Sequence, residues 1–239
     1  MFDAIRFDEV KEALLDFLFP PHCPLCGVYV EHQGDWCEEC LAKTAQPFFV
    51  PLTQKKYGAL NGAWAMGRYE GALRDLILAV KYRAQPSAAR FLHTVTSAAD
   101  KKLTLPPIDM ATAVPLHETR LQERGFNQVQ LIFMPWLEMR HIPLLPLLIR
   151  VKDTRRQFML KSAERFVNIS NAFVINAATV DEDEVRGKSI LLLDDILTTG
   201  STLTECAKVL KAAGASYVYA VTLTGDDNCG VNFGLGQFS

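Results

Sequence analysis

Two adjacent carboxylates followed by a turn of hydroxyl side chains are the strongest chemical signal in the sequence. Asp194 and Asp195 follow an apolar run, and the turn after them consists of Thr198, Thr199, Gly200, Ser201 and Thr202. Hydroxyls and backbone N–H groups at the start of a helix attract an anion, whereas neighbouring carboxylates accept hydrogen bonds from vicinal hydroxyls. The pattern therefore predicts a ribose 5-phosphate site. The alternative is a turn in which Asp and Thr serve only as caps.

A strand must precede these side chains and a helix must follow them. Residues 190–193 are all apolar, as in a strand that is buried on both faces, and residues 203–213 have helical spacing that ends at Gly214. Residues 73–82 predict another helix. Further strands are predicted at residues 63–69, 111–115 and 217–223. This alternation predicts an α/β fold with a parallel sheet covered by helices on both faces.

Four cysteines form a second strong pattern. Cys23, Cys26, Cys37 and Cys40 make two Cys-x2-Cys pairs with ten residues between them. Two such pairs complete a tetrahedral shell of four thiolates for zinc, which leaves no position for a reactive water. We therefore expect a structural zinc site. Two disulfides or a redox dithiol are the alternatives, and a reducing cytoplasm argues against the disulfides.

Polar and basic side chains gather in two further segments. The sequence PLHETRLQERGFNQ, residues 115–128, follows a predicted strand at the place where open α/β sheets bind ligands, although a solvated loop with helix caps is the alternative. Residues 150–165 carry six Lys or Arg against two Asp or Glu. This basic segment is either a plain surface or a lid over an anionic leaving group.

Together these patterns resemble a known family. Residues 190–202, ILLLDDILTTGST, match the phosphoribosyl-pyrophosphate (PRPP) motif of the type I phosphoribosyltransferases at thirteen consecutive positions. Pro-Leu-His followed by Arg-x3-Arg-Gly-Phe-Asn-Gln is similar to the signature of the ComF/GntX family, whose members also begin with a four-cysteine module. These proteins are homologues of phosphoribosyltransferases and are linked to DNA uptake or DNA use. The resemblance extends from about Phe19 to Thr224.

The resemblance implies a type I phosphoribosyltransferase-like fold and a function for particular residues. Asp194 and Asp195 would hold the ribose 2- and 3-hydroxyls, and Thr198 to Thr202 would hold the 5-phosphate. The pyrophosphate, neutralised by Mg²⁺, would lie against Pro115, Leu116 and His117. The catalytic residues would be Arg124, Arg150 and Gln157. A mobile catalytic loop would include Arg150, Thr154, Gln157, Arg165 and Asn168.

Two functions follow from the resemblance. The first is a Mg²⁺-dependent phosphoribosyltransferase that acts on a small nucleophile such as an amine or a base. The second is a non-catalytic protein of a competence machine that handles single-stranded DNA and docks a helicase through its zinc module. The formal net charge of −2 argues against a strong unspecific grip on DNA phosphates.

Composition and local patterns complete the expectations. In a chain of 239 residues, charges near the start and the lack of a run of about eighteen apolar residues predict a cytoplasmic protein without membrane insertion. We expect a helix at residues 3–18, a solvated loop at residues 181–184, and a helix that ends or kinks at Pro135. The expected units are a helix and zinc module at 1–46, a linker at 47–62, a phosphoribosyltransferase-like domain at 63–225 and a tail at 226–239.

Overall fold

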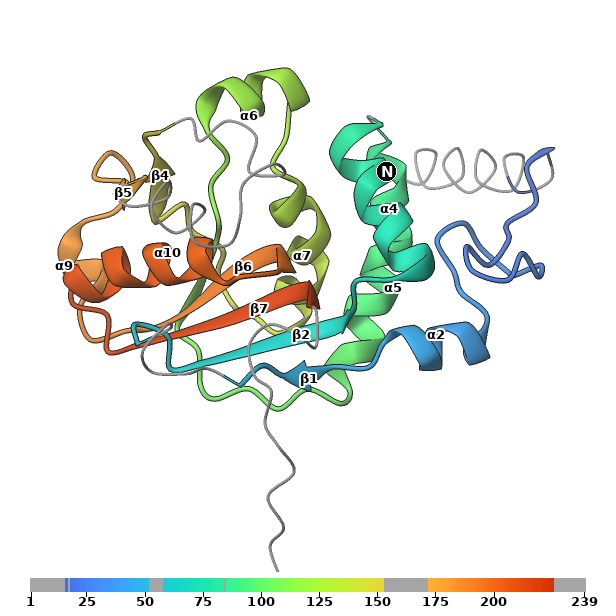
Figure 1. The fold of residues 1–239 in the computed structure, drawn as a ribbon, viewed down its shortest axis with the longest axis horizontal. Helices are drawn as coiled ribbons and strands as arrows, with labels where there is room; N and C mark the ends of the chain where they lie inside the picture. The colour runs from blue at the N-terminus through green and yellow to red at the C-terminus, as the bar shows by residue number, and fades with distance from the viewer. Residues whose placement is uncertain (1–15, 17, 52–57, 84, 153–171, 226–239) are drawn as a thin grey trace, which may run out of the picture.

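A five-stranded sheet forms the centre of the protein (Figure 1). The computed structural model describes residues 16, 18–51, 58–83, 85–152 and 172–225. The strand order is β1-β2-β7-β6-β3, in which β1 pairs antiparallel at one edge and the other strands are parallel. The strands are β1 (Phe48–Phe49), β2 (Gly62–Arg68), β3 (Met110–Ala113), β6 (Ser189–Leu197) and β7 (Tyr217–Gly225).

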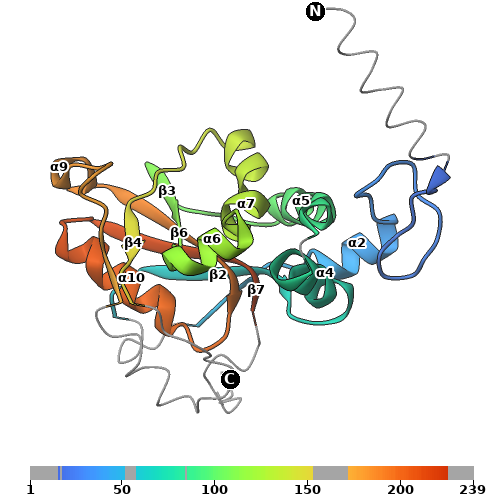
Figure 2. The same cartoon turned by 90° about the horizontal axis from the view of Figure 1, so that it is seen from above.

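Helices cover both faces of the sheet (Figure 2). The helix α10 (Ser201–Ala212) covers one face, and the other face is covered by α4 (Gly71–Tyr82), α5 (Ala89–Asp100) and α7 (Gln128–Met139). Consecutive residues of a strand point to opposite faces, and β6 accordingly contributes Leu191 and Leu193 to one core and Ile190 and Leu192 to the other. The predicted α/β fold with a parallel sheet is confirmed.

The remaining elements lie around this centre. The helix α2 (Glu38–Thr44) and the antiparallel pair of β4 and β5 are found at opposite ends of the molecule (Figures 1 and 2). The others are the 3-10 turn η1 (Pro86–Ala88), α6 (Glu118–Arg124), α9 (Glu182–Val185), β4 (Leu148–Arg150) and β5 (Phe173–Ile175).

Most of the predicted elements are confirmed to within two residues at each end, and two differ. The strand β6 does not stop before the two carboxylates, because it continues through Asp194 and Asp195 to Leu197. Residues 181–184, expected as a solvated loop, instead include the start of the one-turn helix α9. Its first turn is closed by the N–H of Glu184, which donates to the carbonyl of Asp181 at 3.0 Å.

The helix α7 contradicts the prediction that it ends at Pro135, because it continues to Met139. Proline has no N–H, so the carbonyl of Leu131 loses its donor within the helix. His93 on α5 replaces that donor, with Nε2 at 2.9 Å from the Leu131 oxygen. Nε2 must carry the proton, because a carbonyl can only accept. A side chain from the neighbouring helix thus compensates for the hydrogen bond that the proline removes.

The segment predicted as a linker, residues 47–62, contains β1, and its Val50 and Leu60 are buried in the core on the α10 face. The cysteine-rich segment contacts the rest of the chain directly, because Trp36 Nε1 donates to the carbonyl of Phe91 at 2.9 Å. The division of the chain into units stays a prediction. The predicted tail at 226–239 and most of the helix predicted at 3–18 lie outside the described residues.

Candidate functional site

The turn between β6 and α10 has the features of an anion cup. Gly200 has a φ of +69°, in the left-handed region that favours glycine, and α10 begins at the next residue. Ser201 is buried, with its hydroxyl 2.9 Å from Thr199 Oγ1, while Thr202 is half-buried and Thr198 is exposed. The first N–H groups of an α-helix have no acceptor within the helix, and the helix dipole adds partial positive charge there.

The two carboxylates of the PRPP-like motif belong to opposite sides of the sheet. Because Asp194 and Asp195 are consecutive residues of β6, their side chains diverge. Asp195 faces α4 and α7, whereas Asp194 lies on the α10 side. They keep one direct link, since the N–H of Asp195 donates to Asp194 Oδ1 at 2.9 Å. Each carboxylate therefore has its own surroundings.

Asp195 is held by two side chains from distant parts of the sequence. Lys81, in the last turn of α4, places Nζ 2.7 Å from Oδ1, and Gln128, the first residue of α7, donates Nε2–H to Oδ2 at 2.7 Å. The side chains of Asp195 and Lys81 are only 5% and 15% exposed. Burial alone would lower the pKa of Lys81, but the charge and hydrogen bond of Asp195 outweigh it and raise that pKa. Lys81 is therefore a charged partner at neutral pH.

Arg124 extends this network outward. Its guanidinium donates to Gln128 Oε1 and lies over the ring of Tyr82, with Cζ 6.0 Å from the ring centroid. Burial lowers the pKa of Arg124 below its usual value, and the charge of Asp195 opposes this effect. The expected catalytic residue Arg124 is thus connected through Gln128 to the Asp pair, from the side of Asp195.

Asp194 has a different electrostatic environment. Burial, followed by the negative charge of Asp195, raises its pKa to about 7, while Lys81, the N–H of Asp195 and Arg150 act in the opposite direction. A carboxyl group with this pKa exchanges its proton near neutral pH. The ion pair of Lys81 is with Asp195, and Lys81 acts on Asp194 through its charge alone.

The loop at Pro115–His117 and the strand β4 lie side by side. His117 and Arg150 form a parallel β-bridge, and the guanidinium of Arg150 stacks over Phe173, with Cζ 5.5 Å from the ring centroid. Pro115, Leu116 and His117 are half-buried, and His117 Nδ1 accepts the N–H of Thr119 at 3.4 Å to cap α6. Arg150 is therefore brought towards Asp194. The predicted loop residues Thr154, Gln157, Arg165 and Asn168 lie outside the described residues.

Lys81 is the site residue that the sequence patterns do not identify. They place it only at the end of a helix, and 114 residues separate it from Asp195. The one available signal is a lysine directly after an apolar helical run. Gln128 belongs to the polar group at the exit of a predicted strand, but nothing in the sequence pairs it with the Asp motif.

The four expected metal ligands do come together. The Sγ atoms of Cys23, Cys26, Cys37 and Cys40 all lie within 4.8 Å of one another. Zinc–sulfur bonds of about 2.3 Å place the sulfurs of a tetrahedron about 3.8 Å apart, and Cys26 Sγ and Cys37 Sγ are 3.7 Å apart. The donor set therefore fits zinc.

Local backbone geometry explains how each cysteine pair is presented. Gly27, with a φ of +74°, donates its N–H to the carbonyl of Cys23 at 2.9 Å and closes the first turn, and Cys37 caps the start of α2, which carries Cys40. Burial would raise the pKa of Cys23, but backbone N–H groups, that of Cys26 first, outweigh it and lower the pKa to about 6. A thiolate is the form that binds metal.

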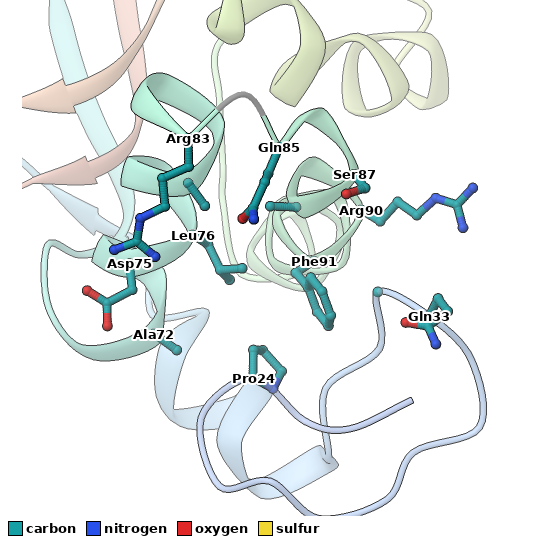
Figure 3. Close-up of a pocket in the computed structure, with 13 residues that line it drawn as sticks. Pro24, Gln33, Ala72, Asp75, Leu76, Arg83, Gln85, Ser87, Arg90 and Phe91 are labelled. Atoms are coloured by element: carbon teal, nitrogen blue, oxygen red, sulfur yellow. The ribbon is translucent and has the colours of Figure 1, made fainter. Parts of the chain in front are cut away.

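A cavity of about 520 Å³ lies elsewhere, between the cysteine-rich segment and the helices α4 and α5 (Figure 3). Pro24 and Gln33 line it from the first side, Ala72 and Arg83 from α4, and Arg90 and Phe91 from α5. Its lining includes neither the Asp pair nor the cup. Because its walls carry neither adjacent carboxylates nor a turn of hydroxyls, the residue chemistry favours the β6–α10 site over this cavity.

Two family models match the chain. A double zinc ribbon domain matches residues 14–51, and a phosphoribosyl transferase domain matches residues 145–232. The first contains all four cysteines and the second contains the Asp pair and the cup. The protein therefore carries a structural zinc module and a phosphoribosyltransferase-like domain, which confirms these two predictions.

Relatives along most of the chain identify the family. Competence protein F of Haemophilus influenzae is 29% identical over 83% of this chain and 82% of its own length. DNA utilization protein YhgH of Salmonella typhi is 31% identical over 82% of this chain and 80% of its own length. The chain belongs to the competence protein F/YhgH family. Its members' names link the family to competence and DNA utilization.

Solved structures are less similar to this family member. Glutamine PRPP amidotransferase from B. subtilis, complexed with ADP and GMP, matches 60% of this chain and 26% of its own, with 17% identity and a TM-score of 0.34. The fold assignment therefore rests on the phosphoribosyl transferase model and on the strand order described above. Among the described residues, no helix is both long and apolar enough to span a membrane.

Proposed function

We propose that this protein binds PRPP or a related ribose phosphate and uses that ligand in DNA uptake or DNA use. One observation carries the proposal: a single continuous segment, from the end of β6 to the first turn of α10, contains a carboxylate for a sugar and an N-terminal helix turn for a phosphate. The phosphoribosyl transferase domain that covers this segment supports the same ligand class.

Each part of the ligand has a partner in the proposal. The 5-phosphate accepts hydrogen bonds from the turn Thr198–Thr202 and the N–H groups that begin α10. The ribose hydroxyls donate to Asp194, because both oxygens of Asp195 already accept hydrogen bonds from Lys81 and Gln128. Asp195 therefore fixes the end of β6, and Asp194 is the main contact to the sugar.

The pyrophosphate of PRPP would lie near Arg150 and the loop Pro115–His117. Mg²⁺ keeps several waters and binds readily through phosphate oxygens, which suits this site because the oxygens of Asp195 are already engaged. In the proposal, Mg²⁺ is held mainly by the pyrophosphate and neutralises it. Arg150 supports the same charge, and Arg124 acts from the side of Asp195 through Gln128.

Transfer of the phosphoribosyl group is the reaction that such an arrangement would support. The bond between the anomeric carbon and pyrophosphate breaks through an oxocarbenium-like state, so the protein mainly has to stabilise charge. The incoming nucleophile, an amine or a base, forms the new bond, and pyrophosphate leaves with the bonding electron pair. Arg124, Arg150 and Gln157 are the proposed catalytic residues.

Isothermal titration calorimetry with PRPP and Mg²⁺ tests the proposal. The parent should bind, and the Asp194→Asn/Asp195→Asn double variant should lose most of the affinity. The matched control is Asp181→Asn/Asp183→Asn, which removes the same charge from exposed positions outside the site. No binding by the parent, or equal binding by the parent and the motif variant, would contradict the proposal.

An adaptor function in a competence machine is the second candidate, and an exposed apolar surface on the zinc module favours it. Leu25, Val28 and Tyr29 are 46%, 50% and 63% exposed although they surround the first cysteine pair. The proposed partner is a competence helicase. Co-purification of the two proteins should be lost in Val28→Ser/Tyr29→Ser while bound zinc is retained, and unchanged co-purification would contradict this candidate.

A further inference from the structure

A row of aromatic rings crosses one face of the sheet, away from the β6–α10 site. Phe49 of β1, Trp64 of β2, and Tyr219 and Tyr217 of β7 follow one another with ring centroids 5.5, 6.1 and 6.1 Å apart. Phe49 is paired directly with Trp64. Tyr217 and Tyr219 stand two residues apart in one strand, so their side chains share a face. We call these four residues the aromatic row.

The row is open to solvent at both ends. Phe49 is 55% exposed and Tyr217 is 50% exposed, whereas Trp64 and Tyr219 are half-buried against the core under α5. Packing alone does not account for large aromatic side chains at these exposures, because a core position would bury them further. The row is thus a surface of ring faces and edges that continues from the core outward.

Gly62 provides the space that lets Trp64 lie over the sheet. A Cβ placed on Gly62 would come within 2.9 Å of the indole Cη2 atom, and Tyr219 lies across the sheet in register with Gly62. A larger residue would therefore push the indole away from its present position. The glycine keeps the row continuous between β1 and β7.

Positive charge lies at the Tyr217 end of the row. Lys211 Nζ is 5.7 Å from the centroid of the Tyr217 ring and donates to the carbonyl of Ser216 at 2.6 Å. The backbone of Lys188 is adjacent as well, because its carbonyl accepts the N–H of Tyr217 at 3.2 Å. A phosphate beside a base on Tyr217 would meet one or two cations.

We propose that the aromatic row binds single-stranded nucleic acid by stacking its bases on these rings. Aromatic side chains on a sheet, with cations beside them, are the features that such binding uses. The steps along the row exceed the spacing of about 3.4 Å per nucleotide in duplex DNA, so an extended single strand fits and a duplex, with its bases already stacked, does not. This site develops the DNA-handling function implied by the family and does not require the ribose-phosphate site.

Fluorescence anisotropy with a labelled oligothymidylate of about twelve nucleotides tests the row. Phe49→Leu/Tyr217→Leu should weaken binding by about 5- to 140-fold for each base that no longer stacks on a ring. The matched variant Phe49→Tyr/Tyr217→Phe keeps both rings and should bind like the parent. Both changes lie at exposed positions, so the fold should persist, and zinc content and the circular dichroism spectrum check this.

Three probes separate base stacking from binding through the phosphates. An abasic oligonucleotide of the same length, which keeps the phosphates, should bind much more weakly than oligothymidylate, and so should the duplex. With one or two phosphates engaged, the logarithm of affinity should fall against the logarithm of salt with a slope of about −0.7 to −1.4. Equal binding of the abasic strand, or unchanged binding by the leucine variant, would overturn the proposal.

Two further measurements assign the result to the row. Asp194→Asn/Asp195→Asn should keep oligothymidylate binding, whereas the leucine variant should keep PRPP binding, so the two proposals fail independently. If sedimentation shows a dimer of the parent that the leucine variant abolishes while oligothymidylate binding is unchanged, the row is an interface between copies and the proposal is wrong.

Discussion

The zinc module and the ribose-phosphate site are built in opposite ways. All four zinc ligands lie within residues 23–40, and tight turns bring them together. The ribose-phosphate site instead joins α4, the loop after β3, α7, β4 and β6, and its most buried ion pair spans 114 residues. A site made within one short segment can be identified from spacing alone, whereas a site made by the whole fold depends on contacts that spacing does not contain.

Removal of a zinc ligand should have the largest effect and should stay local. Cys40→Ser opens the thiolate shell, and structural zinc contributes about 10–16 kcal/mol of apparent binding free energy in small modules. We expect loss of bound zinc, measured by atomic absorption, and greater solvent exposure of Trp36, measured by fluorescence. The control Cys206→Ala should retain zinc, because Cys206 is buried in α10. A variant that still holds one tightly bound zinc would disprove the four-ligand site.

Lys81→Met should show how strongly the assembled site depends on one distant contact. The change leaves Asp195 buried without its cation, which costs about 3–5 kcal/mol of unfolding free energy. Urea denaturation at pH 7 measures this. Most of the loss should be recovered in Lys81→Met/Asp195→Asn.

The matched control is Lys208→Met, which removes a lysine from a largely exposed ion pair with Glu205. Exposed pairs contribute about 0–1 kcal/mol. Equal destabilisation by the two lysine variants would mean that the Lys81–Asp195 pair has no special weight.

The pKa of Asp194 gives a pH test of the same site. Its folded-state value of about 7 is higher than the ordinary value of 3.8, so the folded protein binds the proton more tightly than the unfolded chain. The stability contribution of this group is therefore fully present below about pH 4 and is lost as pH rises towards 7, with a slope of at most about 1.4 kcal/mol per pH unit. Urea unfolding from pH 5 to 7.5 should show a shallower decline for Asp194→Asn. Parallel curves for the parent and the variant would contradict the raised pKa.

The smallest effect concerns the support of α7, which carries Gln128. His93→Phe should cost about 0.5–1.5 kcal/mol, because the carbonyl of Leu131 loses its donor. In a Pro135→Ala background the residue-135 N–H can bond to that carbonyl, so the same His93 change should cost less. A double-mutant cycle measured by urea denaturation gives the difference. Additive effects would show that His93 does not compensate for the proline.

Sequence patterns predicted the parts of this protein that depend on neighbouring residues. The strand before Asp194, the helix after the cup and the cysteine pairs all follow from local periodicity, glycine placement and ligand spacing. The partners of Asp195 could not be predicted in the same way, because Lys81 and Gln128 reach it only after the sheet has ordered α4 and α7 beside β6. The path of α7 past Pro135 also depends on another helix, since His93 supplies the missing donor.

The two margins of the sheet bear on aggregation. At one margin the edge strand β1 has only two residues and lies between Pro47 and Pro51, and at the other the outer side of β3 is occupied, because Ala111 exchanges backbone hydrogen bonds of 2.8 and 2.9 Å with Pro143 and Leu145. Short strands, flanking prolines and covered edges deny foreign strands a template for pairing. The apolar parallel sheet that carries the site is thus protected against edge-to-edge association along both margins.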